Sequence, residues 1–347
     1  MGGFPRAASG SAVPGFLVPP LLVGCAMTDR VVYLNGEYVT ESAARVSIFD
    51  SALMFGDMAF EMTRTFRQQP FHLRAHLDRL YGSLDLLEID CGLTLDEMEA
   101  RTLQTLERNQ PTEAEDVDWQ IMHNVSRGPL PLYGTVFGGR PEPTVTINCW
   151  PLITHMAGFV ANYQNGLRLA ICAQQAIPAH LLDPKAKTRS RMHYQMAVLQ
   201  GARLGEGIWP VMLDPDGFLA EGPGWNVFLV KDGVISTPEP RNCLLGVSRG
   251  NVLELARQLA IPVREVNLGR YEALRADEIF CTSTTYCICH AVSFEGQAVG
   301  NGGPGPVFQQ LQAAWKEQVG VDFVAQAESY AGRLADWREA ELAVAAS

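Results

Sequence analysis

The 347-residue sequence has no apolar run long enough to cross a membrane, because a spanning helix needs roughly 20 consecutive apolar residues. It also has no excess of positive charge, since 38 acidic and 27 basic residues give a formal net charge of −11. Such a chain has no general attraction for nucleic acid or for anionic membranes, so any anion site must be a local cluster of basic side chains. We therefore expect neither a nucleic-acid partner nor a membrane partner.

The sequence also lacks the common motifs of metal sites, nucleotide sites and serine hydrolases. No pair of histidines has the spacing of metal ligands, and there is no H-E-x-x-H, no phosphate-binding P-loop and no G-x-S-x-G. Of the eight cysteines only Cys287 and Cys289 are closely spaced, and a single C-x-C pair is weak support for a metal site. We expect no metal ion, and we expect buried, reduced thiols of the kind found in cytoplasmic proteins.

The first 26 residues differ from the rest in being rich in Gly, Ala, Ser and Pro. They contain an apolar patch from Phe16 to Val23, and Leu22-Val23-Gly24-Cys25 resembles a lipoprotein cleavage box. Prolines interrupt this region, however, and Arg6 is its only basic residue, whereas an export signal has a clean apolar stretch and a basic start. We expect residues 1–26 to be a disordered tail or the product of a start assigned too far upstream, with export as the alternative.

Hydrophobic periodicity predicts an α+β arrangement for the first half of the chain. Asn35-Gly36 predicts a hairpin turn within residues 31–39. Leucines at helical spacing predict a helix over 73–89, and the capping-box pattern of Thr94 and Glu97 predicts a second helix over 95–108. Further strands are predicted near 119–125 and 143–149, so we expect a mainly antiparallel sheet.

In the second half, strands and helices are predicted again after a connector that lacks hydrophobic periodicity. Strands are expected at 167–172, 208–213 and 278–282. Helices are expected at 190–205 and 306–317, and a further helix is expected to begin after a cap at Ser248. We therefore expect two domains with a cleft between them, which is where small-ligand sites are commonly found. The expected boundaries are 27–151 for a small N-terminal domain, 152–165 for the connector and 166–347 for a larger domain.

A lysine and a carboxylate in the second half form the most informative pair in the chain. Lys187 precedes the predicted helix, and Glu221 opens a glycine-rich turn that leads into an apolar strand. Pyridoxal phosphate chemistry requires at least two protein groups: a lysine that forms a Schiff base and a carboxylate that keeps a pyridine nitrogen protonated. From the residues alone, a solvated basic segment and a surface glutamate remain simpler explanations, and Lys185 is a rival for the same role.

Other residues are candidates to bind anions. A phosphate needs a fork of donors or the N-terminus of a helix, and the candidates are Arg79, the amides of Val247 and Ser248, and the hydroxyls of Ser283 and Thr284. A substrate carboxylate can be held by two hydrogen bonds from one guanidinium, and the candidates are Arg64 and Arg127. A structural ion pair is the alternative for each arginine.

Together these features resemble the class IV aminotransferases, the fold-type IV pyridoxal phosphate enzymes. The family includes branched-chain amino acid aminotransferases, D-amino acid transaminases, (R)-selective amine transaminases and aminodeoxychorismate lyase. The resemblance runs from Val32 to Trp315 and rests on the order and spacing of several short motifs. These are Tyr33-Leu34-Asn35-Gly36, Phe55-Gly56-Asp57, His76-Leu77-Asp78-Arg79-Leu80, Lys187, Glu221-Gly222-x-Gly224-x-Asn226-Val227-Phe228, Gly246-Val247-Ser248-Arg249 and Thr282-Ser283-Thr284-Thr285.

The resemblance implies a small N-terminal α/β domain, a larger C-terminal domain with a mainly β core, and a homodimer with its sites near the interface. It implies that Lys187 holds pyridoxal 5'-phosphate as an aldimine and that Glu221 pairs with the ring nitrogen. The implied phosphate ligands are Arg79, Val247, Ser248, Ser283 and Thr284. The implied substrate ligands are Phe60, Arg64 and Arg127.

The resemblance leaves the substrate subgroup open. Phe60-Glu61-x-x-Arg64 resembles the pattern of branched-chain enzymes, but Lys187 is not followed by their Gly-Gly-Asn-Tyr. Val125-Ser126-Arg127-Gly128 resembles the carboxylate-binding segment of D-amino acid transaminases, which have a tyrosine in place of Phe60. The implied activity is transfer of an amino group between a branched-chain-like or other hydrophobic amino acid and a 2-oxo acid. A D-amino acid or (R)-amine transaminase, or a lyase related to aminodeoxychorismate lyase, is the alternative.

Overall fold

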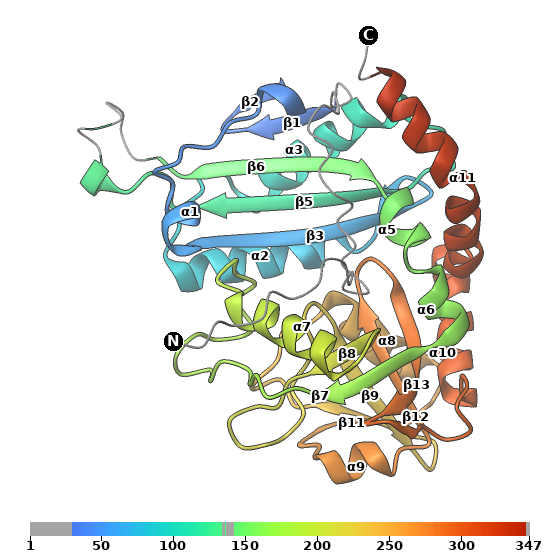
Figure 1. Ribbon diagram of the computed structural model, residues 1–347. Coiled ribbons are helices and arrows are strands. Elements are labelled where there is room, and N and C mark those ends of the chain that lie inside the picture. The colour runs from blue at the N-terminus through green and yellow to red at the C-terminus, as the bar shows by residue number, and fades with distance from the viewer. Residues whose placement is uncertain (1–29, 134–135, 137–141, 345–347) are drawn as a thin grey trace, which may run out of the picture.

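Two β-sheets, one from each half of the chain, organise the protein (Figure 1). The computed structural model describes residues 30–133, 136 and 142–344. The expectation for residues 1–26 therefore lies outside the described residues. Helices pack against both sheets, and the predicted α+β class is confirmed.

The first sheet has the strand order β2-β1-β6-β5-β3-β4, and every neighbouring pair in it is antiparallel. Its strands are β1 (Val31–Leu34), β2 (Glu37–Thr40), β3 (Met58–Phe66), β4 (Gln69–Pro70), β5 (Trp119–Ser126) and β6 (Thr144–Pro151). The predicted hairpin joins β1 to β2, and its turn residues Asn35 and Gly36 have φ angles of 48° and 97°. This turn needs two consecutive positive φ angles, which is why Asn-Gly is favoured there.

Two long helices pack with their apolar sides against this sheet. α2 (Leu73–Leu87) lies against β3, and α3 (Leu95–Asn109) lies against β1 and β6. Leu77, Leu80 and Leu84 recur at helical spacing and are buried in the core between α2 and the sheet. The predicted capping box at Thr94 and Glu97 is confirmed, because each residue's side chain accepts a hydrogen bond from the other's amide. The connections hold η1 (Glu41–Ala43), α1 (Ser51–Phe55), η2 (Gln110–Thr112) and η3 (Pro131–Tyr133).

The second sheet is mixed, with the order β11-β10-β9-β12-β13-β7-β8 and with β14 paired to β13. Its strands are β7 (Leu167–Ile171), β8 (Ile208–Val211), β9 (Asn226–Lys231), β10 (Val234–Pro238), β11 (Val263–Val266), β12 (Glu278–Ser283), β13 (Cys287–Phe294) and β14 (Gln297–Ala298). The pairs β10–β11, β7–β13 and β7–β8 are parallel, and the rest are antiparallel. The stacked rings of Phe228 and Phe280 lie in the core beneath this sheet.

The helices of the second half are α7 (Met192–Leu204), α8 (Val247–Gln258), α9 (Arg270–Leu274) and α10 (Pro306–Val319). α7 packs beside β8, while α8 and α10 pack on each other and on β12. The prediction that Ser248 caps a helix is wrong, because α8 begins at Val247 and has Gly246 at its N-cap. A Cβ on Gly246 would lie 2.2 Å from Asn226 Oδ1, so this close approach is possible only for glycine.

The segment predicted as a connector without periodicity contains α5 (Ile153–Ala157) and α6 (Val160–Asn165). Leu152, Ile153 and Met156 are completely buried there. A helix of five or six residues completes fewer than two turns, which is too short to show a hydrophobic period. β6 ends at Pro151 and β7 begins at Leu167, while the division into domains at 151 and 166 stays a prediction.

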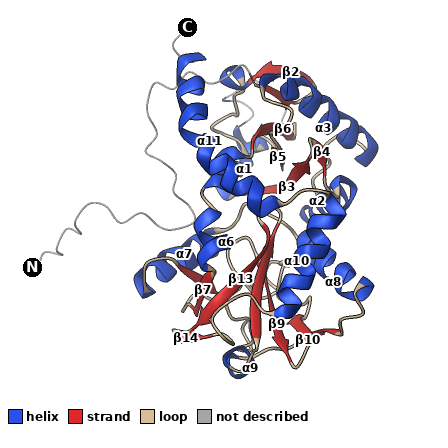
Figure 2. Cartoon of the chain, turned by 90° about the vertical axis from the view of Figure 1, so that its right-hand side faces the viewer, coloured by secondary structure: helices blue, strands red, loops and turns tan. Residues whose placement is uncertain are grey.

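The C-terminal helix α11 (Phe323–Val344) was not predicted, and it ties the two halves together. It packs against α5 and runs beside the first sheet (Figures 1 and 2). The Tyr330 hydroxyl accepts a hydrogen bond from the Asp118 amide at 2.8 Å and donates one to the Asp116 carbonyl at 3.1 Å. Phe323 and Tyr330 also belong to the apolar core that contains Phe228 of the second sheet.

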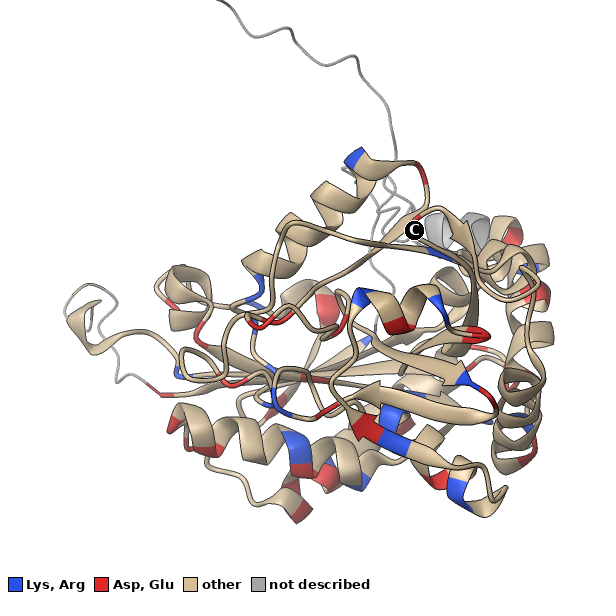
Figure 3. Ribbon diagram, turned by 90° about the horizontal axis from the view of Figure 1, so that it is seen from below, with Lys and Arg blue, Asp and Glu red and all other residues tan. Residues whose placement is uncertain are grey.

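The surface mixes charged and apolar regions. Basic and acidic residues lie interspersed along the elements (Figure 3). No helix within the described ranges combines the length and apolar character needed to cross a membrane. Apolar side chains are exposed in and before α1, where Val46, Ile48, Leu53 and Phe55 have exposed fractions of 54%, 69%, 68% and 69%.

Tyr330→Phe is expected to lower the free energy of unfolding by about 1–3 kcal/mol, because the buried Asp118 amide then loses its acceptor. Urea denaturation followed by circular dichroism measures this change. Tyr271→Phe is the matched control, since its ring is 72% exposed and the substitution should cost less than about 0.5 kcal/mol. Equal stability of the two variants would show that the Tyr330 hydrogen bonds do not hold α11 in place.

Candidate active site

The segment that carries Lys187 lies beside β3 like an additional strand. The Phe60 amide donates a hydrogen bond to the Lys187 carbonyl, and the Arg189 amide donates one to the Met58 carbonyl, both at 2.9 Å. The Lys187 amide donates to the Ser83 hydroxyl of α2 at 3.0 Å. These bonds hold a residue of the second half against the first sheet, so Lys187 lies where the two halves meet.

The side chain of Lys187 enters a pocket, whereas that of Lys185 does not. Lys187 Nζ lies 4.6 Å from the centroid of the Phe60 ring. Lys185 Nζ instead pairs with Asp183 Oδ2 at 3.1 Å, and its side chain is 44% exposed. The structure therefore distinguishes the two candidate lysines, because Lys187 lines the pocket and Lys185 does not.

The surroundings of Lys187 favour its neutral form. Burial lowers the pKa of this amine to about 7. The carboxylates of Glu61 and Glu221 oppose the shift, and the guanidinium groups of Arg79 and Arg191 add to it. Since the neutral amine is the nucleophile and the base, a large fraction of Lys187 is ready for either role near neutral pH.

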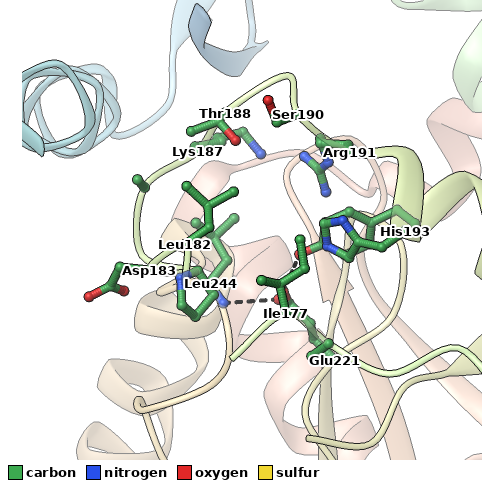
Figure 4. Close-up of a pocket in the computed structure, with 14 residues that line it drawn as sticks. Ile177, Leu182, Asp183, Lys187, Thr188, Ser190, Arg191, His193, Glu221 and Leu244 are labelled. Atoms are coloured by element: carbon green, nitrogen blue, oxygen red, sulfur yellow. Dashed lines mark hydrogen bonds between the residues drawn. The ribbon is translucent and has the colours of Figure 1, made fainter. Parts of the chain in front are cut away.

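Glu221 faces Lys187 from the other end of the same pocket and is only 3% exposed (Figure 4). The Tyr194 hydroxyl donates a hydrogen bond to one carboxylate oxygen. The Leu244 amide donates to the other oxygen at 3.0 Å. Burial raises the pKa of Glu221, while the hydrogen bonds from Tyr194 and Leu244 lower it. These two donors fix the orientation of the carboxylate.

The pocket between these residues has an apolar wall and a polar wall (Figure 4). Its lining is Ala176, Ile177, Leu182, Asp183, Pro184, Ala186, Lys187, Thr188, Ser190, Arg191, His193, Tyr194, Glu221 and Leu244. No group of three or more His, Cys, Asp or Glu side chains in the described part of the chain is arranged to hold a metal ion. The chemistry that the pocket offers is that of an amine facing a carboxylate.

The predicted phosphate ligands of α2 and α8 lie next to each other. Arg79 Nη1 donates a hydrogen bond to the Leu245 carbonyl at 2.8 Å, directly before α8 begins. Gly246 at the N-cap has no side chain to satisfy the amides of Val247 and Ser248. First-turn amides have no acceptor inside their own helix, so these two are free to bind an anion beside the guanidinium.

The predicted hydroxyl ligands follow a strand that adjoins the same helix start. Asn226, whose Oδ1 lies against Gly246, pairs in register with Thr282 across β9 and β12. Ser283 and Thr284 come directly after Thr282. The structure therefore brings Ser283 and Thr284 toward the start of α8 from the side of the second sheet.

A buried ion pair holds Arg79 in position. Its Nε and Nη2 each donate to an oxygen of Glu61 at 2.7 Å, and His76 Nδ1 lies 3.0 Å from the same carboxylate. Burial would raise the pKa of Glu61, but Arg79 and His76 outweigh this and hold it well below its usual range. We did not predict Glu61 or His76 as partners of Arg79. The spacing of His76 and Arg79, three residues apart on one helix face, is the signal that points to a shared partner.

Arg64 and Arg127, the predicted carboxylate ligands, do not line the pocket. Arg64 is 1% exposed and donates to the Thr285 carbonyl at 2.8 Å and to Gln326 of α11 at 2.7 Å. Arg127 forms an ion pair with Asp57 and donates to two carbonyl groups at the C-terminal end of α2. Both guanidinium groups join elements of the fold, so we do not propose either one as a substrate ligand.

Phe60, the remaining predicted substrate residue, does lie beside Lys187. Its ring is surrounded by cations, because the Arg189 and Arg191 guanidinium carbons lie 3.8 and 5.3 Å from its centroid. Neither Arg191 nor Tyr194 was among the predicted cofactor or substrate ligands, although both line the pocket. Their positions at the start of the helix that follows Lys187, three residues apart, are the sequence signal for them.

Comparison with known proteins identifies the family of the chain. The family model described as amino-transferase class IV matches residues 58–294. A putative branched-chain-amino-acid aminotransferase of Methanocaldococcus jannaschii is 31% identical over 287 residues, which are 82% of this chain and 95% of the relative. A D-alanine aminotransferase of Bacillus licheniformis is 28% identical over 289 residues, which are 83% of this chain and 96% of the relative.

Solved structures agree with this assignment. The branched-chain amino acid aminotransferase of Escherichia coli superposes with a TM-score of 0.73 at 26% identity, covering 84% of this chain and 94% of the other. A T.th. branched-chain amino acid aminotransferase with pyridoxamine 5'-phosphate has a TM-score of 0.73 at 24% identity, covering 85% and 95%, and shows the shared fold. The chain belongs to the class IV aminotransferases, a family of pyridoxal phosphate enzymes, and is an aminotransferase of the fold-type IV architecture.

Proposed function

We propose that the protein is a pyridoxal phosphate-dependent aminotransferase that moves an amino group between a hydrophobic, branched-chain-like amino acid and a 2-oxo acid. One observation supports this most strongly: Lys187 and Glu221 face each other across one pocket where the two halves of the chain meet. Lys187 would bind the cofactor covalently, and Glu221 would accept a hydrogen bond from its ring nitrogen.

The residues around the pocket fit this cofactor. The amides of Val247 and Ser248 are left open by Gly246, and Arg79 adds positive charge beside them, which suits a phosphate. Ser283 and Thr284 offer hydroxyl donors from the adjoining strand end. When bound, the cofactor supplies an electron-withdrawing ring that stabilises negative charge at the reacting carbon of the substrate.

Lys187 would also move the proton of the reaction. Its amine, with a pKa of about 7, is neutral often enough at neutral pH to take the proton from the α carbon of the amino acid. With a 2-oxo acid as acceptor, the protonated amine returns a proton to the corresponding carbon in the reverse half-reaction. Glu221, oriented by hydrogen bonds from Tyr194 and Leu244, would hold its carboxyl group toward the ring nitrogen of the cofactor.

The substrate class is inferred from the apolar wall of the pocket. Ile177, Leu182 and Leu244 fit a hydrophobic side chain, and the Methanocaldococcus relative carries a branched-chain name. The similarity to a D-alanine aminotransferase favours a D-amino acid donor as the second candidate. The amino acid that reacts as the amino-group donor distinguishes the two candidate functions.

Lys187→Ala is expected to abolish covalent cofactor binding and to lower turnover by about a thousandfold or more, because no other lysine is among the described residues that line the pocket. Absorbance of the purified protein with added pyridoxal phosphate reports the first effect, and a coupled assay reports the second. Lys185→Ala is the matched control, since Lys185 pairs with Asp183 outside the pocket. Full turnover in Lys187→Ala would rule out the proposed role of this lysine.

The same absorbance measurement on the wild-type protein tests the substrate class. L-Leucine, D-alanine and an (R)-arylamine are added separately, and 2-oxoglutarate or pyruvate follows as acceptor. We expect L-leucine to bleach the cofactor band and the acceptor to restore it. Bleaching by D-alanine alone would favour the second candidate. Formation of product without any acceptor would indicate a lyase instead of an aminotransferase.

The rate at which the cofactor-free protein takes up pyridoxal phosphate is expected to rise with pH, with an inflection near 7. The pKa of Lys187 is lowered to about 7, so the amine is neutral and nucleophilic above that pH and protonated below it. A lysine with an ordinary pKa of about 10.4 would gain its neutral form only at much higher pH. Stopped-flow absorbance between pH 5.5 and pH 9 measures the profile, and a flat rate from 6 to 8 would contradict the lowered pKa.

We also propose that the protein forms a homodimer through the apolar surface at residues 46–55. The side chains of Val46, Ile48, Leu53 and Phe55 are more than half exposed there, and apolar sets of this kind are typical of interfaces. The Ser190 hydroxyl donates to the Gly56 carbonyl at 3.1 Å. This surface therefore adjoins the pocket, and a second copy bound to it would cover one side of the site.

Leu53→Asp combined with Phe55→Asp is expected to shift the protein from a dimer to a monomer of about 38.0 kDa, because two carboxylates cannot be buried in an apolar interface. Size-exclusion chromatography with light scattering measures the mass. Leu103→Asp is the matched control, since Leu103 is an exposed leucine on α3, away from this surface. A wild-type protein that is already monomeric, or a variant that stays dimeric, would disprove this interface.

A further inference from the structure

Arg191 is a cation of the pocket that has no ion-pair partner among the described residues. It lies at the N-cap of α7 and lines the pocket together with Lys187 and Glu221 (Figure 4). Neither an ion pair nor a hydrogen bond joins its guanidinium group to any residue in the described ranges. Its guanidinium carbon instead lies 4.2 Å from the centroid of the Tyr194 ring and 5.3 Å from that of Phe60.

The other arginines near the site are already engaged. Arg79 is held by Glu61 and the Leu245 carbonyl. Arg189 donates to Asn124 Oδ1 at 3.0 Å, and its guanidinium carbon lies 3.8 Å from the centroid of the Phe60 ring. Arg64 and Arg127 lie outside the pocket lining. Among the described lining residues, Arg191 is therefore the guanidinium that remains open to a ligand.

The surroundings of Arg191 make it a strong anion-binding group. It is half-buried, and a partly desolvated guanidinium gains more from an oxygen anion than an exposed one does. The rings of Phe60 and Tyr194 restrict the guanidinium plane, so less conformational entropy is lost when a ligand binds. Charge and rigidity together suit a carboxylate or a similar oxygen anion.

We propose that Arg191 binds an anionic oxygen of the molecules that react at Lys187. The inference rests on the proposed function and identifies the residue that recognises these molecules. Amino acids and 2-oxo acids each carry a carboxylate, and pyridoxal phosphate carries a ring phenolate beside its aldehyde. The phosphate itself is not the ligand of Arg191, because Arg79, Val247 and Ser248, three of its proposed ligands, gather beside Leu245, and the neighbouring Leu244 lies across the pocket from Arg191 (Figure 4).

Two substitutions and one control test this proposal. Arg191→Met removes the charge and keeps an unbranched apolar stem, and Arg191→Lys keeps the charge but loses the planar fork. Arg203→Met, in the last turn of the same helix, removes an exposed positive charge and is the control. Thermal midpoints are measured for all variants, so that loss of folding is recognised.

Two binding measurements separate the sources of the anion. The first is the affinity of the cofactor-free protein for pyridoxal phosphate, measured by isothermal titration calorimetry. The second is the ratio of affinities for 4-methylvaleric acid and its neutral amide, measured on the cofactor-loaded protein by absorbance. The acid and the amide share one apolar chain, so their ratio isolates the contribution of the carboxylate.

If Arg191 binds the substrate carboxylate, Arg191→Met should lower the acid-to-amide ratio roughly 10- to 100-fold and leave the cofactor affinity unchanged. If it binds the cofactor phenolate, the same variant should lower the cofactor affinity by a similar factor and shift the pH midpoint of the cofactor absorbance. Arg191→Lys should lie between Arg191→Met and the wild type. Either result supports the proposal.

An unchanged ratio and an unchanged cofactor affinity in Arg191→Met would overturn the proposal, whether or not the thermal midpoint falls. A wild-type protein that takes up no pyridoxal phosphate would instead contradict the proposed function. In that case the acid and the amide are compared on the cofactor-free protein by thermal shift. Equal shifts for the wild type and Arg191→Met would then refute anion binding by Arg191 separately.

Discussion

The backbone pairing between the Lys187 segment and β3 is the constraint on which the site depends. It crosses from the second half of the chain to the first sheet. Two hydrogen bonds fix the main chain of Lys187, and a third fixes that of Arg189. A backbone ladder sets direction as well as position, so the Lys187 side chain is directed past Phe60 toward Glu221. Two residues earlier, where the ladder has not begun, Lys185 turns to Asp183 near the surface.

The second constraint is electrostatic and is built into the same sheet. Glu61, next to Phe60 on β3, holds Arg79 of α2 by a buried bidentate ion pair. Such a pair contributes little net stability, because desolvation offsets most of the attraction. Its value lies in orientation: two nitrogens of Arg79 are committed to Glu61, and the third faces the start of α8. A cation positioned before its ligand arrives loses little on binding.

The sequence predicted those features whose determinants are local. The Asn35-Gly36 turn, the leucine spacing of α2 and the capping box of α3 each lie within one short segment, and all three were found. The pairing of Lys187 with Glu221 in one pocket was predicted through an ordered set of motifs. Arg64 was a candidate substrate ligand because a guanidinium can hold a carboxylate by two hydrogen bonds. No local pattern reveals that its partners lie at Thr285 and Gln326, more than 200 residues away. The helix α11, which supplies one of those partners, was likewise not predicted.

The distribution of charge explains how an acidic chain can attract anionic substrates. The protein carries a net charge of −11, yet Arg79, Arg189 and Arg191 gather around Lys187. Glu61 and Glu221 are buried and already accept hydrogen bonds from fixed donors, and Asp183 pairs with Lys185. In a pocket with low-dielectric walls this local excess of positive charge is screened far less than charge on the open surface. Arg79 and Arg191 add to the effect of burial in lowering the pKa of Lys187 to about 7, so the arrangement that draws an amino acid or a 2-oxo acid in also keeps a large fraction of the lysine ready to react near neutral pH.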